Sequence, residues 1–218
     1  MDHNEPTDQA ANGVALEAIS LPRREAEAIA AVVDSLVAPG PTLSGTRRRE
    51  LATAARQALG DEAIHQSTDA ELRLAVTMAS AAHTIRPGDV ERVLAAGLEP
   101  TTYVEILSLV ARLVAVDTVH FGLGLDPIQL PQPVAGTPSG WVDAKAAIDG
   151  GWLPTVGPAA PPNALSLLPG EHQAMHDLHG ALYLSVEEMA DTDATRGLHR
   201  TQMELVAART SLLNECFF

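Results

Sequence analysis

Glu204 and Cys216 are the residues whose types and spacing are best suited to chemistry. Cys216 is the only cysteine of the chain, and Glu204 lies twelve residues before it. A cysteine reacts as its thiolate, and a thiol with an unperturbed pKa of about 8.5 is only slightly ionised at pH 7. A nearby carboxylate can accept the thiol proton, and Asn214 is a good N-cap for a helix whose N-terminus would stabilise the anion. A lone cysteine is more often structural than reactive, and with Cys216 third from the end we expect no helix to follow it. The pair is therefore a candidate for thiol chemistry.

Histidines form the second candidate cluster. His172, His176 and His179 are four and three residues apart, so on a helix they share one face. Such a face can bind Zn²⁺, but no further ligand pattern accompanies it, and a solvated or partner-facing stripe is the favoured interpretation. The sequence thus predicts no metal and no cofactor. His83 and His120 lie in apolar surroundings, and we expect them to be hydrogen-bonded core residues.

The composition indicates helices and excludes some partners. Apolar residues make up 46% of the chain but aromatic residues only 3%, which favours packed helices over sheets. The net charge of −14 would repel nucleic acids and anionic membranes. The local exception is the run Arg47, Arg48 and Arg49, which we interpret as the solvated start of a helix rather than a phosphate site.

Membrane insertion and secretion are not indicated. The most apolar stretch, residues 103–121, is interrupted by Glu105, Arg112 and Asp117, which favours a buried helix over a membrane span. Residues 1–20 contain acidic side chains and no apolar run, so the sequence does not indicate a signal peptide there. We expect a cytoplasmic protein.

Periodicity and capping residues predict an all-α chain. Helices are expected over about 16–38, 47–59, a segment capped by Asp69, and about 90–96, 103–121, 171–184, 185–190 and 201–213. The helix over 103–121 is apolar nearly all round, with Glu105, Ser108 and Arg112 in one narrow polar stripe. We expect it to be buried on most sides and to pack against another subunit, which makes the protein a homo-oligomer.

Residues 127–168 are expected to be a linker. They contain eight of the fifteen prolines and both tryptophans, and a segment of this length is too long for an ordinary connection within a compact domain. We expect it to lie over a surface, with Trp141 and Trp152 as possible anchors.

A weak internal repeat relates the two sides of this linker. At an offset of 154 residues Glu50 coincides with Glu204, and Leu51 coincides with Leu205. At the same offset Glu62 falls on the position of Cys216.

The segment Gln202-Met-Glu204-Leu-Val-Ala-Ala-Arg-Thr-Ser-Leu-Leu-Asn214-Glu-Cys216 resembles the active-site entry of the alkylhydroperoxidase AhpD and carboxymuconolactone decarboxylase superfamily. Peroxidase-like members of that all-α family carry Glu, eleven residues, Cys-x-x-Cys, and a His four residues on. Residues 88–98, 103–107 and 123–125 resemble the helices that follow this motif.

The resemblance implies a two-lobed arrangement. Residues 1–15 would be a flexible N-terminus, 16–126 a lobe lacking the thiols, 127–168 the linker, and 169–218 the start of a second lobe that is truncated after its opening helices. In the first lobe Glu62 and His65 stand where the family has its two cysteines, so that lobe is degenerate and Glu50 is expected to be structural.

The function implied by the resemblance is thiol-dependent, antioxidant reduction of alkyl hydroperoxides, a peroxiredoxin-type activity. Cys216 would be the catalytic thiol, Glu204 its proton acceptor, and a dithiol the reductant. We expect this activity to be impaired, because the chain has no second cysteine or following His to resolve a sulfenic acid. A terminal carboxylate two residues beyond Cys216 would also raise the pKa of the thiol. The alternative is a non-catalytic, oligomeric helical module that binds a partner or a small molecule.

Overall fold

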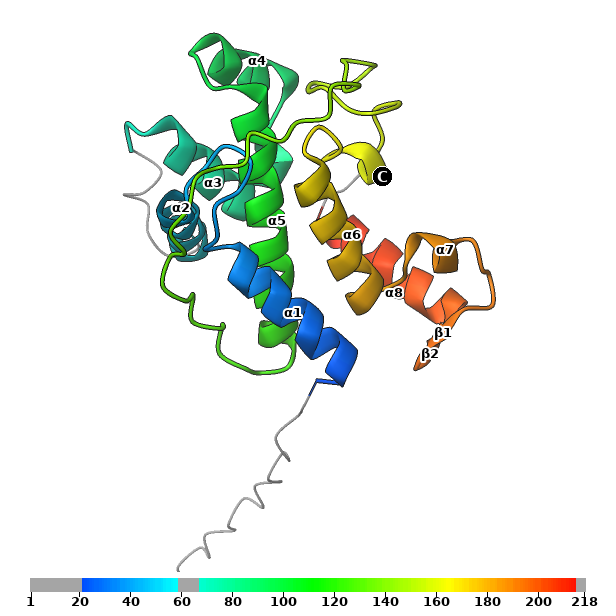
Figure 1. Ribbon diagram of the computed structural model, residues 1–218. Helices are drawn as coiled ribbons and strands as arrows, with labels where there is room; N and C mark the ends of the chain where they lie inside the picture. Colours follow the sequence, from blue (N-terminus) through cyan, green and yellow to red (C-terminus); the bar gives the residue numbers. More distant parts are fainter. Residues whose placement is uncertain (1–20, 59–66, 215–218) are drawn as a thin grey trace, which may run out of the picture.

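Helices dominate residues 21–58 and 67–214, which are the residues that the computed structural model describes (Figure 1). The α-helices are α1 Arg23–Ser35, α2 Gly45–Gln57, α3 Ala70–Ser80, α4 Pro87–Ala95, α5 Pro100–Gly122, α6 Pro169–Leu182, α7 Val186–Met189 and α8 Arg200–Leu213. Two 3₁₀ turns, Ala82–Thr84 and Pro161–Asn163, and a hairpin of β1 Thr195–Arg196 with β2 Leu198–His199 complete these ranges. The prediction of an all-α protein is confirmed.

Short polar side chains and prolines begin the helices where the sequence indicates. The Ser44 hydroxyl accepts a hydrogen bond from the backbone N–H of Arg47 at the start of α2. The Asp69 carboxylate accepts from the first turn of α3. Proline occupies the first position of α4, α5 and α6, where its missing N–H has no helical partner. Helix α1 begins at Arg23, later than the expected start, and residues 16–20 lie outside the described ranges.

Helix α5 is the centre of the fold. It contacts α1, α2, α3 and α6, which lie around it in Figure 1. Its residues Ile106, Leu109, Leu113 and Val116 are almost completely buried. The apolar character that suggested a subunit contact therefore has an explanation within one chain over most of the helix surface. In the described part of the chain, no helix combines the length and hydropathy needed to span a bilayer.

Residues 127–168 form an ordered strap that runs from the end of α5 across the bundle to the start of α6 (Figure 1). The backbone N–H of Val134 donates to the Val37 carbonyl at 2.8 Å, and that of Ser139 donates to the Gly40 carbonyl at 2.9 Å. Trp141 and Trp152 remain 60% and 51% exposed. Backbone hydrogen bonds thus hold the strap, rather than deep burial of the two tryptophans that we considered as anchors.

The C-terminal elements rest on the bundle through α6. Helix α6 packs on α1 and α5, while α7 and the hairpin lie to its right in Figure 1 and α8 runs back behind it. Helix α8 buries Met203 and leaves most of its other side chains exposed.

Candidate functional site

The predicted carboxylate Glu204 lies on α8, where two side chains hold it. The Tyr183 hydroxyl donates to its Oε1 at 2.7 Å, and Nε of Arg200 donates to the same oxygen at 2.6 Å. The hydrogen bond from Tyr183, followed by that from Arg200, lowers the pKa of Glu204. The carboxylate is half exposed and ionised at neutral pH, and its lowered pKa makes it a weaker proton acceptor than an unpaired glutamate.

Tyr183 and Arg200 were not predicted as site residues. Arg200 precedes Glu204 by four residues, a spacing that favours an ion pair on a helix and that the sequence contains. Tyr183 comes from the end of α6, twenty-one residues away, and local spacing gives no sign of it. Arg200 also donates to the carbonyls of Glu188, Met189 and Asp191. It therefore ties α8 to the end of α7.

Cys216, Glu62 and His65 lie outside the described residues. Glu50, which we expected to be structural, is exposed on α2 and accepts a hydrogen bond from Arg47 at 2.8 Å.

The interpretation of the arginine run as a solvated face is wrong. Arg47 pairs with Asp69 and Glu71 at the start of α3, in addition to Glu50. Arg49 donates to the Pro131 carbonyl of the strap. Arg48 is only 1% exposed. The three arginines contact carboxylates and carbonyls, several of which are distant in sequence. The spacing of residues along the sequence does not reveal such contacts.

Arg48 belongs to a buried charge cluster with Glu105, Arg112 and Glu171. Its Nη1 donates to Glu105 at 2.5 Å and to Glu171 at 2.8 Å. Arg112 donates to the other oxygen of Glu171, and the Ser108 hydroxyl donates to the same oxygen at 2.7 Å. Two guanidinium groups thus face two carboxylates, so the cluster is neutral. It joins α2, α5 and α6.

The second oxygen of Glu105 organises the loop before α2. It accepts hydrogen bonds from the backbone N–H and the hydroxyl of Thr42, both at 2.6 Å, and from the N–H of Leu43 at 3.1 Å. The polar stripe that the sequence predicted on this helix is therefore the α5 side of the cluster. Within the described residues, Nε of Arg48 is the one nitrogen of the cluster that is buried without a partner.

The charges in the cluster depend on one another. Burial alone would raise the pKa of Glu171, but Arg112 and Arg48 outweigh it and hold that pKa below its usual range. Burial lowers the pKa of Arg112 despite the attraction of Glu171. The arrangement is that of a structural ion network, because nearly all of its polar atoms are already engaged with one another.

The lowered pKa of Glu171 makes stability depend on pH. Its stabilising contribution is complete above the unfolded pKa of about 4.5 and is lost as pH falls through the lower folded value. We expect the free energy of unfolding of the wild type, measured by urea denaturation, to fall more between pH 7 and acid than that of Glu171→Gln. Because the other carboxylates are common to both proteins, parallel curves would contradict this assignment.

The histidine cluster is only partly assembled. The rings of His172 and His176 meet edge to face with centroids 4.3 Å apart, whereas Nδ1 of His179 lies 2.7 Å from the Leu184 carbonyl. Burial, and then His176, lowers the pKa of His172. Across residues 21–58 and 67–214, no three His, Cys, Asp or Glu side chains are grouped so that they could hold a metal ion.

The two other histidines differ in their environment. His120 is 8% exposed, and its Nδ1 lies 2.9 Å from the Asp126 carbonyl, so the expectation of a hydrogen-bonded core residue is confirmed. His83 is exposed in the turn after α3, and the same expectation is wrong for it. The turn exposes His83 although apolar residues surround it in the sequence.

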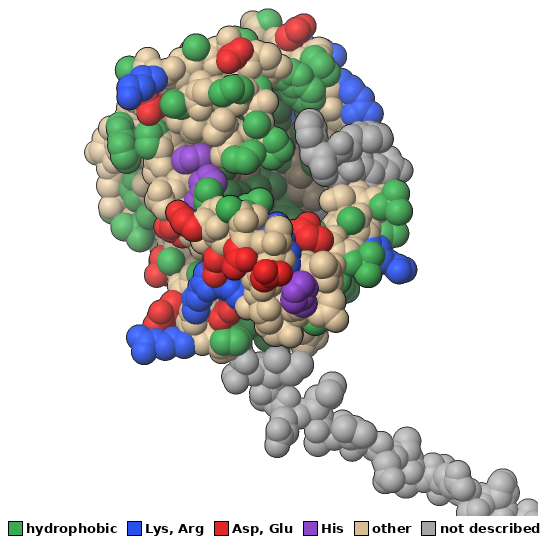
Figure 2. All heavy atoms as spheres, turned by 90° about the vertical axis from the view of Figure 1, so that its right-hand side faces the viewer, with side chains coloured by type: hydrophobic (Ala, Val, Ile, Leu, Met, Phe, Trp, Pro, Cys, Tyr) green, Lys and Arg blue, Asp and Glu red, His purple; other side chains and the backbone are tan. Residues whose placement is uncertain are grey.

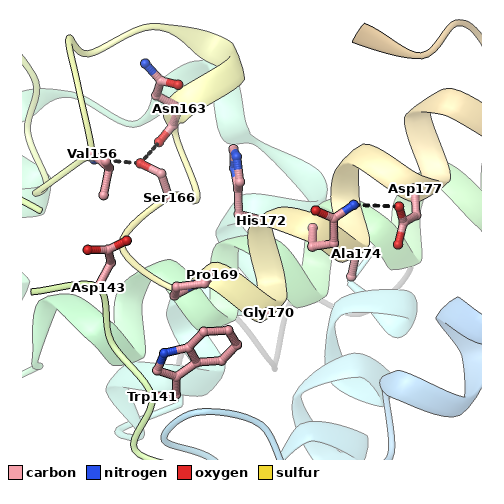
Figure 3. A pocket seen from close by; sticks show the side chains of 11 residues that line it. Trp141, Asp143, Val156, Asn163, Ser166, Pro169, Gly170, His172, Ala174 and Asp177 are labelled. Atoms are coloured by element: carbon pink, nitrogen blue, oxygen red, sulfur yellow. Dashed lines mark hydrogen bonds between the residues drawn. The ribbon is translucent and has the colours of Figure 1, made fainter. Parts of the chain in front are cut away.

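A hollow of about 710 Å³ lies between the strap and the first turns of α6. The Asp143 N–H donates to the Leu167 carbonyl, which folds the strap back toward α6. Figure 3 shows the Trp141 ring beside Pro169 and Gly170, with His172 in the same first turn of the helix. Figure 2 shows that this side of the molecule is hollowed, with hydrophobic side chains on the wall and mixed charges below.

Comparisons with known proteins identify no relative. No family model, no curated protein and no solved structure matches the chain.

Proposed function

We propose that the chain is a member of the AhpD-like, carboxymuconolactone decarboxylase superfamily with a thiol-dependent peroxide-reducing role. The observation that supports this most is the setting of Glu204. The carboxylate expected twelve residues before the thiol is ionised, half exposed, and oriented by Tyr183 and Arg200.

The reaction proposed for Cys216 begins with transfer of the thiol proton to a base such as Glu204. The thiolate attacks one oxygen of the peroxide, the O–O bond breaks, and the departing alkoxide takes up a proton to leave as an alcohol. Cysteine is thereby oxidised to a sulfenic acid. An external dithiol attacks this sulfur, releases water and forms a mixed disulfide. Its second thiol then restores Cys216 and leaves the reductant as a disulfide.

Peroxide consumption with a dithiol reductant tests this proposal. We expect Cys216→Ser to abolish thiol-dependent turnover, and Glu204→Gln to reduce it by about 10²-fold or more through loss of the proton acceptor. Glu187→Gln is the matched control, because Glu187 is an exposed carboxylate of α7 that contacts neither Tyr183 nor Arg200. Equal turnover by wild type and Cys216→Ser would reject the enzymatic role for this chain.

A second candidate function is a non-catalytic, self-associating binding module. The observation that favours it is the hollow of about 710 Å³, which is lined by Trp141 and His172 and does not include Glu204. A ligand held there would contact the strap and α6 and would not need Cys216. Quenching of Trp141 fluorescence by a ligand, compared between the wild type and Trp141→Phe, tests this function separately from peroxide turnover.

Self-association is part of both proposals. Helix α5 was expected to contact a second copy, and its residues Val114, Thr118 and Phe121 are exposed.

A further inference from the structure

A hollow of about 370 Å³ lies between α3, the turn that follows it, α4 and α5. Its volume is at the lower end of the range of about 300–1,000 Å³ that small-molecule sites occupy. Both charged and apolar side chains line it, among them Arg73, Leu74, Asp89, Val93 and Tyr103. We call this space the Tyr103 hollow.

Tyr103 is a buried tyrosine whose hydroxyl has no hydrogen-bond partner among the described residues. The residue is only 4% exposed, and a buried tyrosine hydroxyl usually finds a partner. Burial raises the pKa of Tyr103, and the negative charge of Asp89 raises it further, so the hydroxyl stays protonated and lies within the field of that carboxylate. Because Asp89 lines the same hollow, the hydroxyl faces this space and can bond to a ligand there.

Two side chains of opposite charge line the hollow. Arg73 on α3 is exposed, and within the described ranges its side chain donates to the Ser67 carbonyl and pairs with no carboxylate. Asp89 on α4 accepts from the side chain of Arg92 and from the N–H of Arg86, both at 2.9 Å, and its oxygens have further lone pairs to offer. A simple anion would be repelled by the carboxylate, and a simple cation by the guanidinium. A ligand that carries both charges is therefore favoured.

Apolar side chains form another part of the wall. Leu74 is buried and Val93 is partly buried. An aliphatic group placed against them would lose contact with water, which favours binding. The hollow thus offers partners for an ammonium group, a carboxylate and a short aliphatic chain, and an amino acid combines these three groups in one small molecule.

We propose that the Tyr103 hollow binds an α-amino acid with an apolar side chain. The ammonium group lies between the Asp89 carboxylate and the Tyr103 hydroxyl oxygen, and both accept hydrogen bonds from it. The ligand carboxylate pairs with the guanidinium of Arg73, whose planar fork suits a carboxylate. The aliphatic side chain packs on Leu74 and Val93.

Isothermal titration calorimetry of the full chain tests this site, with L-alanine, L-valine, L-leucine and L-methionine as probes. We expect saturable binding of at least one of them. For the amino acid that binds most tightly, the amine without the carboxylate and the acid without the amine should each bind at least about tenfold more weakly. For leucine these analogues are isoamylamine and isocaproate. Absence of binding by all four amino acids, or equally tight binding of either analogue, would overturn the proposal.

Two variants test whether the amino acid is held in this hollow. Tyr103→Phe removes the hydroxyl and keeps the ring, so affinity should fall at least about tenfold. The melting temperature should not fall, because the hydroxyl has no partner in the described part of the chain to lose. Arg73→Gln should weaken binding by a similar factor. Arg23→Gln is the matched control, because this arginine side chain of α1 is 89% exposed and lies outside the hollow. Unchanged affinity in Tyr103→Phe or in Arg73→Gln would reject the assignment.

This inference goes beyond the proposed function and is tested separately from it. None of the measurements uses peroxide or depends on Cys216. Trp141 does not line the Tyr103 hollow, so its fluorescence should not respond to the amino acid. Failure of the peroxidase assay, or of the Trp141 quenching assay, can therefore be distinguished from failure of amino acid binding.

Discussion

Replacing Glu171 by alanine is expected to lower the free energy of unfolding by about 3–5 kcal/mol, measured by urea denaturation at neutral pH. The carboxylate accepts hydrogen bonds from Arg48, Arg112 and Ser108 in the interior. Its removal leaves Arg112, which is 1% exposed, without a carboxylate partner. Desolvation of that guanidinium is then uncompensated, and this loss exceeds the loss of packing.

Two comparisons isolate the electrostatic origin of this effect. Glu50→Ala removes an exposed ion pair with Arg47 and should change stability by about 1 kcal/mol or less. Combining Glu171→Met with Arg112→Leu removes one charge of each sign and leaves Arg48 paired with Glu105. We expect the double variant to recover much of the stability lost by Glu171→Ala, because apolar replacement of a buried pair is often tolerated. A double variant less stable than Glu171→Ala would refute this account.

Gly40→Ala is expected to lower the free energy of unfolding by about 3 kcal/mol. This is the upper end of the usual loss from overpacking and the lower end of the usual loss from breaking a buried ion pair. A methyl group on Gly40 would overlap Oε1 of Glu105 and Nη1 of Arg48, the atoms that form their shared hydrogen bond. Neither side chain has free space to move into, because both are buried by the bundle. Thermal unfolding followed by circular dichroism measures the effect.

Gly88→Ala is the matched control for Gly40. Gly88 lies in the first turn of α4, and a methyl group there would meet nothing within 4 Å. Alanine favours helix over glycine by about 1 kcal/mol or less, so this variant should be equally stable or slightly more stable. Similar losses at both positions would show that the overlap with the charge cluster is not the cause.

The sequence predicts the helices well because their signals are local. Asp69 caps α3, prolines begin α5 and α6, and apolar residues recur at helical spacing within each helix. The packing of the helices against one another depends on contacts between residues that are distant in sequence. Arg48 shows this difference, since its neighbours Arg47 and Arg49 are identical in type, yet Arg48 alone is fully buried.

In the candidate site, too, the local pairings can be predicted from the sequence and the contacts between helices cannot. Glu204 and its pairing with Arg200 follow from local spacing, but the Tyr183 hydroxyl reaches it from another helix. His172 and His176 are in contact as their spacing predicts. The ring of His179 instead pairs with the Leu184 carbonyl just beyond the end of α6. The position of that carbonyl depends on where the helix ends, which the spacing of the histidines does not indicate.

The sequence separations within the buried charge cluster affect the order in which the protein can fold. Arg48 meets Glu105 across 57 residues and Glu171 across 123. During synthesis Arg112 emerges well before Glu171, so it must stay hydrated until the strap has been made and α6 can dock. Contacts of such long range are slow to form because the loop between them must first be closed. Docking of α6 is therefore expected to be a late step in folding, after the helices themselves have formed.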